Sequence, residues 1–533
     1  MKTVRILHRR DGQPRLVLPG LAVLMTAFLV ALGVSMLAAR PRTDEQRAKT
    51  LSRSSSYALA EAIYVRLLAE RPSVPVLLEF LSNHRSGVAD EENRRQTKGL
   101  GSSAAEVMDE DALAALLGAL PEDLLLVARF VAEEHPPASV QDAVVAGARR
   151  DPPVPWYNHL LAEAALQEGR PSEAAAYFER EGLAFRERSR DVDKAVAIWM
   201  DSDDWDEVRR RMSDPRVASA TGPETHERFA EHERDWPSAM KWFALAWRGR
   251  LTLFGLGMSG TAALAWGFFC SRLGKLAERP GRRLAFYVIA FGLGVLSIVP
   301  TVLLITVEEI KLRLVETGDP LRDILFFVFG VGLREEASKL LLFAFLLPVL
   351  RKWGDKLDVL VCGAMVGLGF AAEENLGYLT SGDLHTGLGR FLTANFLHIA
   401  MTGVLATALD DLVGDPERQA PEFSRTALMV ISLHGAYDFL LSHEELGGSF
   451  MAMAVFVFLT RLFLGAVERA RKRVDRGLSP LHAFVLAAAV VTGVSAAYAT
   501  LAVGPLNAVF AMAEGLLGEA IIFAMFVGTL RAM

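Results

Sequence analysis

The stretch FGVGLREEASKLLLFAFLLP, residues 329–348, decides how the rest of this sequence is interpreted. Most of it is typical of a helix in a lipid bilayer, yet Arg334, Glu335, Glu336 and Lys339 lie near its middle. Ionisable residues are costly inside a membrane helix and by default mark functional sites. We therefore expect a polar site within a bundle of spanning helices, with Arg334 balancing the acidic pair.

Composition supports a membrane protein and excludes two other classes. Of the 533 residues 51% are hydrophobic, and they gather into runs of about 20 residues, the length that crosses a bilayer as a helix. No basic domain with interleaved aromatic residues is present, so we expect no nucleic-acid partner. Cys270 and Cys362 both lie in apolar runs, which excludes a disulfide framework or a thiolate metal site.

The apolar runs predict an all-α, polytopic membrane protein with about ten transmembrane helices. The first run, residues 16–39, follows a basic leader and is longer than the apolar core of a signal peptide, so a retained anchor is favoured over a cleaved signal. The other nine candidates cover residues 250–271, 284–307, 323–350, 358–380, 391–410, 425–442, 449–467, 481–502 and 506–530.

Lysine and arginine concentrate in alternate connections between these runs, and such residues favour the cytoplasmic side. This pattern predicts a multi-pass protein of the cell membrane with both termini in the cytoplasm. It divides the chain into a leader and anchor (residues 1–39), an extracytoplasmic region (residues 40–249) and a multi-span membrane domain (residues 250–533).

The extracytoplasmic region is repetitive. Ser139, Ser172, Asp206 and Ser238 each open a helical pattern with an N-cap type of residue, at spacings of 33, 34 and 32 residues. Residues 156–181 resemble a tetratricopeptide (TPR) repeat, with two short helices, a turn at Gly169 and alanines where helices meet. We expect a TPR-like α-solenoid that binds a protein partner; unrelated helical hairpins are the alternative.

Four consecutive predicted membrane helices carry polar side chains at helical spacing. These are Glu335 with Lys339, Glu374 four positions after Phe370, His398, and His434 with Asp438. From the predicted boundaries, the last three helices place theirs roughly 9–12 Å below the outer surface, and Glu335 lies roughly 18 Å deep. We therefore expect Glu335 to share a pocket with His398 and His434 in the outer half of the membrane.

The same residues form four motifs in order. EEASK matches EExxK, FAAEE matches FxxxE, HGAYD matches HxxxD, and HIAMTG supplies a histidine between the last two. In this the sequence resembles the PrsW family of intramembrane proteases, which are relatives of the type II CAAX prenyl proteases and the ABI (CPBP) membrane proteins. The resemblance covers about residues 320–445, the predicted protease core, and implies hydrolysis of a peptide bond in or near the membrane.

Chemistry assigns roles to these residues within that resemblance. Glu335 would be the base that activates water, because desolvation makes a carboxylate more basic, with Lys339 as its counter-charge. His398 and His434 could bind a metal or donate to the developing oxyanion. Glu374 and Asp438 could complete a zinc shell or orient the imidazoles by hydrogen bonds. A Zn²⁺ site and a metal-free, glutamate-activated water both remain open.

Other polar residues in the spans have simpler interpretations. Glu336 is equally suited to a catalytic and a structural role. Phe370 is expected to pack over the site, and Asn375 to form a hydrogen bond between helices, as membrane amides commonly do. Glu514 and Glu519 in the last predicted span belong to no motif and are expected to pair across helices.

The favoured interpretation is a metallo- or glutamate-dependent membrane endopeptidase. Its substrate would be a membrane protein cut at the extracytoplasmic side; the family resemblance implies the first cut of an anti-sigma factor. The outer repeats would recruit substrate or restrain access. The alternatives are an ion- or proton-coupled transporter or receptor, and a scaffold without catalysis. The motif charges favour the enzyme because they gather toward one side of the membrane, whereas an ion pathway needs them along its full depth.

Overall fold

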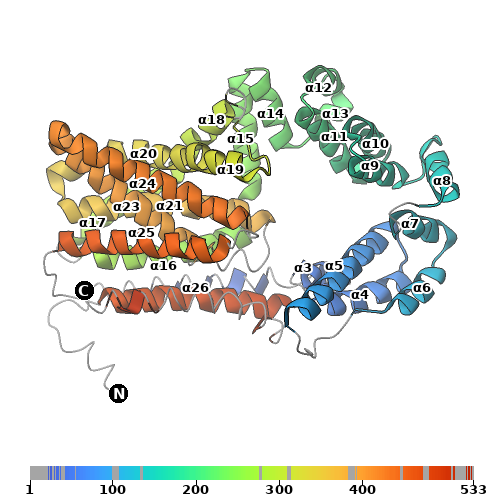
Figure 1. The fold of residues 1–533 in the computed structure, drawn as a ribbon, viewed down its shortest axis with the longest axis horizontal. Coiled ribbons are helices and arrows are strands. Elements are labelled where there is room, and N and C mark those ends of the chain that lie inside the picture. The colour runs from blue at the N-terminus through green and yellow to red at the C-terminus, as the bar shows by residue number, and fades with distance from the viewer. Residues whose placement is uncertain are drawn as a thin grey trace. The chain divides into compact units, whose positions relative to one another are not determined.

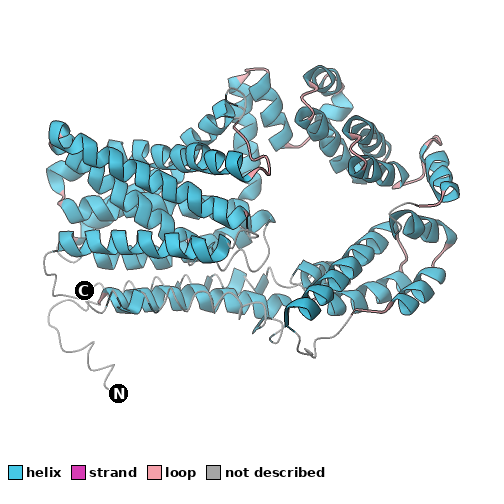
Figure 2. Cartoon of the chain, viewed as in Figure 1, coloured by secondary structure: helices cyan, strands magenta, loops and turns pink. Residues whose placement is uncertain are grey.

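A computed structural model describes residues 43–503 with gaps at 54–55, 99–106, 133–135, 275, 277–278, 309–311, 313, 382–389, 392, 444–447 and 472–478, together with scattered positions outside this range. Every regular element among these residues is a helix, and none is a strand (Figure 2). The expectation of an all-α protein is confirmed for the described part of the chain.

The chain divides into two compact units, Pro41–Gly249 and a second unit that combines Met1–Arg40 with Arg250–Met533. The helices of the first unit are short. They are α3 Asp44–Arg53, α4 Tyr57–Glu70, α5 Val74–Lys98, α6 Glu110–Gly118, α7 Glu122–Ala132, α8 Ala138–Ala148, α9 Tyr157–Gln167, α10 Pro171–Ala184, η1 Arg186–Arg188, α11 Ser189–Asp201, α12 Trp205–Met212, α13 Pro215–Ala220, α14 Pro223–His232 and α15 Trp236–Arg250.

Helices α8, α10, α12 and α15 begin one or two residues before the four polar positions of the predicted repeat. Those four residues therefore lie inside the first turn, and the expectation that they cap the helices is wrong. At α10 the reason is Pro171, which suits the first helical position because it has no N–H to satisfy. At α12 the cap is Asp204, whose carboxylate accepts a hydrogen bond from the Glu207 N–H. The assignment of this unit to TPR-like repeats stays a prediction.

The helical hairpin formed by α9 and α10 has the predicted details. Gly169 lies between the two helices with φ of +70°, a left-handed conformation that glycine adopts without steric cost. Four alanines of the hairpin are fully buried, so the helices pack closely there. This core consists of Ala162, Ala165, Ala174 and Ala175 with Phe178, Val192, Ala195, Val196 and Trp199.

Glu181 on α10 is an unusual member of this core, because it is completely buried. One carboxylate oxygen accepts a hydrogen bond from the Trp156 N–H at 2.5 Å, and the other has no hydrogen-bond partner. Burial is the main cause that raises the pKa of Glu181, and the nearby Asp191 adds to it, while the hydrogen bond from Trp156 and the charge of Arg188 act in the opposite direction.

The membrane unit contains several longer helices that run side by side in Figure 1, together with three short segments. They are α16 Leu253–Leu273, α17 Pro280–Leu296, α18 Ile298–Val307, α19 Pro320–Leu325, η4 Phe326–Gly332, α20 Leu333–Trp353, α21 Lys356–Ser381, α23 Ala394–Gly414, α24 Pro416–Ser442, α25 Gly448–Arg471 and α26 Pro480–Val503. The three short segments are α18, α19 and η4.

Five segments among the described residues are long and apolar enough to cross a membrane. They are Leu253–Leu273, Pro280–Ile305, Ala394–Gly414, Met451–Arg471 and Pro480–Thr500. Helix α20 is not among them, since it carries four ionisable residues near its start. The total of about ten spans stays a prediction. Most of the predicted anchor and of the last span, including Glu514 and Glu519, lies outside the described residues.

Two glycines let helix backbones come into contact around the polar residues. A Cβ atom at Gly367 of α21 would collide with the carbonyl oxygen of His398 on α23. A Cβ atom at Gly435 of α24 would collide with the carbonyl oxygen of Phe327 in η4, a π-helical turn that leads directly into α20. Small residues are common where membrane helices pack this closely, and π turns are frequent at functional sites.

The substitution Gly367→Ala should destabilise the membrane unit by about 1–3 kcal/mol, because the added methyl group has no room against α23. Gly292→Ala on α17 is the matched control, since nothing lies within 4 Å of the position that its added methyl group would take. Thermal unfolding of the full-length protein in detergent should show a lower midpoint for Gly367→Ala only. Equal midpoints for both variants would contradict the close packing.

The substitution Glu181→Gln should make the stability of the unit Pro41–Gly249 less dependent on pH. The folded state keeps the Glu181 proton to a higher pH than the unfolded chain, so the free energy of unfolding falls as pH rises from the ordinary glutamate pKa through the raised one. Glutamine has no such proton. Unfolding followed by tryptophan fluorescence between about pH 4 and pH 8 should show a flatter profile than wild type. The substitution Glu173→Gln, at an exposed position of the same helix, should leave the pH dependence of unfolding as in wild type. If Glu181→Gln shows the same pH dependence as this control, the prediction is refuted.

Candidate functional site

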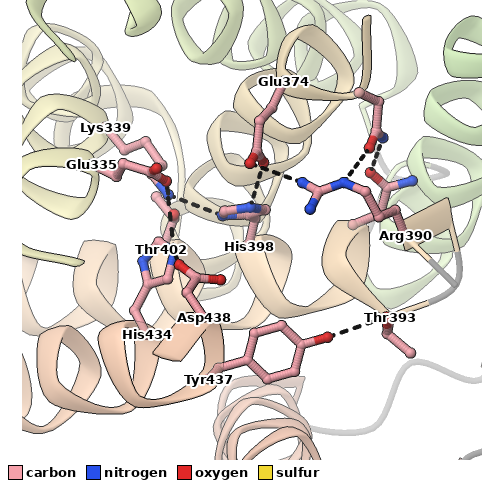
Figure 3. A network of polar contacts seen from close by, with 12 residues as sticks. Glu335, Lys339, Glu374, Arg390, Thr393, His398, Thr402, His434, Tyr437 and Asp438 are labelled. Carbon is pink, nitrogen blue, oxygen red and sulfur yellow. Dashed lines mark hydrogen bonds and ion pairs between the residues drawn. The ribbon is translucent and has the colours of Figure 1, made fainter. Parts of the chain in front are cut away.

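The polar residues of the membrane unit meet where α20, α21, α23 and α24 come together (Figure 3). Helix α20 contributes Glu335, Glu336 and Lys339 from its first two turns. All three are buried, with exposed fractions of 8%, 1% and 0%. None of them is turned toward lipid.

Lys339 lies at the centre of the site. Its ammonium nitrogen is 2.6 Å from Glu336 Oε1, 3.0 Å from His398 Nδ1 and 3.5 Å from Glu335 Oε2. The ring of Phe370 on α21 lies 4.2 Å from the same nitrogen, which adds a cation–π contact. The three N–H groups of the ammonium thus face three acceptors, and Phe370 packs over the site as expected.

The two adjacent carboxylates differ in how firmly they are held. Glu336 lies 2.6 Å from Lys339 and 3.0 Å from His434 Nδ1, and it accepts a hydrogen bond from Thr402 Oγ1 at 3.3 Å. Glu335 has only longer contacts, 3.5 Å to Lys339 and 3.6 Å to His434 Nε2. Glu336 is therefore fixed on every side, whereas Glu335 keeps oxygen lone pairs that can accept a hydrogen bond from water.

The two imidazoles approach each other edge to face, with ring centroids 5.3 Å apart. His398 Nε2 lies 3.0 Å from Glu374 Oε2, and His434 Nε2 lies 3.4 Å from Asp438 Oδ2. The structure therefore brings all the motif residues into one network. Glu374 and Asp438 lie beside the imidazoles, where each can orient a ring.

Arg390, which precedes α23, completes the network and is not singled out by any sequence motif. It pairs with Glu374 Oε1 at 2.8 Å, donates to Asn375 Oδ1 at 3.3 Å and lies 3.5 Å above the ring of Tyr378. Asn375 in turn donates to Asn395 on α23 at 2.9 Å, the hydrogen bond between helices that the sequence predicted. The available sequence signal for Arg390 was an arginine at the edge of one predicted span, next to another span that carries Glu374 six residues before its end.

Arg334 does not balance the acidic pair as expected. Its guanidinium lies 2.5 Å from Glu308 Oε2, just beyond the end of α18. Successive residues of a helix point about 100° apart, so Arg334 faces a different neighbour from Glu335.

Three of these side chains could hold a metal ion. Glu335, His398 and His434 each offer one ligand atom, and these atoms lie within 4.8 Å of one another. Two histidines with one glutamate are a known donor set of catalytic zinc sites, so the residue types fit. The sequence predicted His398, His434, Glu374 and Asp438 as ligands. The group in the structure contains the two histidines, but its carboxylate comes from Glu335 instead of Glu374 or Asp438.

Comparisons with known proteins match the same part of the chain. Residues 282–463 match the model of a family described as PrsW family intramembrane metalloprotease. The chain is 27% identical over 179 residues to Protease PrsW of Clostridioides difficile (strain 630), and the match covers 32% of this chain and 74% of that relative. No solved structure matches the chain at a significant level.

The matched segment contains α20, α21, α23 and α24, and with them every residue of the polar network from Glu335 to Asp438. Its helices include candidate membrane spans, and its polar residues come from the motifs of the sequence resemblance. Residues 282–463 of this multi-pass membrane protein therefore match the PrsW family of intramembrane proteases.

Proposed function

We propose that this chain is an endopeptidase in which Glu335 activates water to hydrolyse a peptide bond of a membrane protein. The observation that carries the proposal is the difference between the two carboxylates. Glu336 is held by Lys339, His434 and Thr402, while Glu335 has no contact shorter than 3.5 Å to these groups. A general base must be free to accept a proton from water, and Glu335 meets that requirement.

The reaction follows from the positions of these groups. Glu335 removes a proton from water as the water oxygen attacks the scissile carbonyl carbon. The same carboxyl then delivers this proton to the amide nitrogen as the carbon–nitrogen bond breaks. Lys339 remains as the counter-charge and limits the cost of a carboxylate in a buried site.

The second imidazole is suited to act on the substrate oxygen. His434 Nε2 faces Glu335 and Asp438, at 3.6 Å and 3.4 Å. When protonated, Nε2 can donate to the oxyanion that forms during attack. A divalent metal held by Glu335, His398 and His434 would supply the same charge stabilisation and a more acidic water, and Glu335 would then be a ligand. In the metal-free mechanism Glu335 is the base.

The proposed side of the membrane follows from the charge distribution of the sequence, and the proposed substrate follows from the resemblance to the PrsW family. With both termini in the cytoplasm and ten spans, the site lies in the outer half of the bilayer. The substrate is then cut at its extracytoplasmic side, which suits the first cut of an anti-sigma factor in regulated proteolysis. Residues 40–249, as a TPR-like domain, recruit that substrate or a partner that controls access. The family match favours this function over a transporter, a receptor or a silent scaffold.

The substitution Glu335→Gln should reduce the rate of peptide-bond hydrolysis by about 10²–10⁴-fold, because the amide cannot accept the proton of water. Purified wild type and variant would be compared in detergent micelles with one membrane-protein substrate. Glu422→Gln, an exposed change near the start of α24, should retain wild-type activity. Full activity in Glu335→Gln would exclude Glu335 as the base.

The substitution Arg390→Met should lower kcat by about 10–100-fold, because Glu374 loses the partner that orients it toward His398. Arg390→Lys should recover part of the loss, and the exposed Arg425→Met should have no effect. Since Arg390 acts through Glu374, Arg390→Met should add little to Glu374→Gln in a double variant. Additive losses would indicate that Arg390 acts by another route.

The position of the cut tests the proposed orientation. The protein would be reconstituted into vesicles with single-span substrates, and the products mapped by mass spectrometry. We expect the cleaved bonds in the extracytoplasmic half of the substrate segment or just outside it. Products that map only to the cytoplasmic side would refute this part of the proposal.

A further inference from the structure

The hydrogen bonds of His398 determine which of its two ring nitrogens carries the hydrogen. An ammonium group has three donors and no acceptor. His398 Nδ1, at 3.0 Å from Lys339 Nζ, must therefore be the acceptor in that contact and carry its lone pair toward the lysine. The hydrogen of the neutral ring is then on Nε2, which donates to Glu374 Oε2 at 3.0 Å.

Both ring nitrogens of His398 are consequently in use. A histidine binds a metal through the lone pair of a deprotonated nitrogen. Nδ1 can offer its lone pair to a metal only after the Lys339 ammonium has moved away, and Nε2 only after the hydrogen bond to Glu374 is lost. Of the three residues that could hold a metal, His434 is different, because its Nε2 faces Glu335 and Asp438 and no lysine.

The same ammonium also lies against the carboxylates of the site. It is 2.6 Å from Glu336 Oε1 and 3.5 Å from Glu335 Oε2, and it is fully buried. A divalent ion bound by Glu335 and His398 would come close to this positive charge in a region with little water to screen the repulsion. The lysine and the metal therefore compete for one histidine nitrogen and for the same negative charge.

We propose that Lys339 is an internal cation that competes with a divalent metal for the donor set of Glu335, His398 and His434. With the lysine inserted, the site is satisfied without a metal, and metal binding requires the ammonium to withdraw from His398. Phe370 strengthens the inserted position, since its ring lies 4.2 Å from the ammonium. This proposal rests on the residues of the proposed active site, but it does not require that they hydrolyse a peptide bond.

The test measures zinc affinity without any substrate. Full-length protein in detergent would be titrated against a chromophoric zinc chelator, and bound zinc would be counted by elemental mass spectrometry after desalting. Lys339→Met keeps the length of the side chain and removes its charge, so it should bind zinc at least tenfold more tightly than wild type. Lys339→Arg keeps a cation and should show no gain, and Lys356→Met at the exposed start of α21 is the matched control.

Two further variants make the result specific. Adding His434→Ala to Lys339→Met should abolish the gained affinity, which shows that zinc occupies this donor set. Phe370→Leu removes the cation–π contact with Lys339, so it should also bind zinc more tightly than wild type, but by a smaller factor than Lys339→Met. If Lys339→Met does not fold, Phe370→Leu takes its place in the test. Unchanged or weaker zinc binding in folded Lys339→Met, or in Phe370→Leu in its place, would overturn the proposal. Because no hydrolysis is measured, a failure of the proposed protease activity would leave this result unaffected.

Discussion

The structure of the polar site depends on the buried ammonium group of Lys339. It lies 2.6 Å from Glu336 and 3.0 Å from His398, and no part of the residue is exposed. Removing one partner of a buried ion pair costs about 3–5 kcal/mol, because the remaining charge has no water to solvate it. Lys339 neutralises the charge of Glu336 on its own helix, α20. Because it also contacts His398 on α23, it fixes the position of these two helices relative to each other.

Close backbone contacts make this polar cluster compatible with a membrane helix bundle. Gly367 lets α21 touch α23 at His398, and Gly435 lets α24 touch the π-helical turn η4 before Glu335. Because the helices meet without side chains between them, short polar side chains reach across the bundle. The same contacts bury Glu335, Glu336 and Lys339 between helices, whereas Glu374 and Asp438 stay partly exposed.

The sequence was sufficient for much of this description. Charges within an apolar run predicted a functional site in a helical membrane protein, and the i, i+4 spacing of Glu335 with Lys339 and of His434 with Asp438 placed each pair on one face. Asn375 was correctly expected to form a hydrogen bond to a neighbouring helix. These properties follow from hydrophobicity and helical period, which are local.

Only the tertiary structure decided which neighbour each side chain meets. It separated the tightly held Glu336 from the loosely held Glu335, paired Arg334 with Glu308, and brought Arg390 to Glu374 from outside every motif. The direction of a side chain depends on the rotation of its helix, and the π turn of η4 changes that rotation for the residues that follow. Sequence spacing gives the face that two residues share, but the packing of the bundle determines what that face contacts.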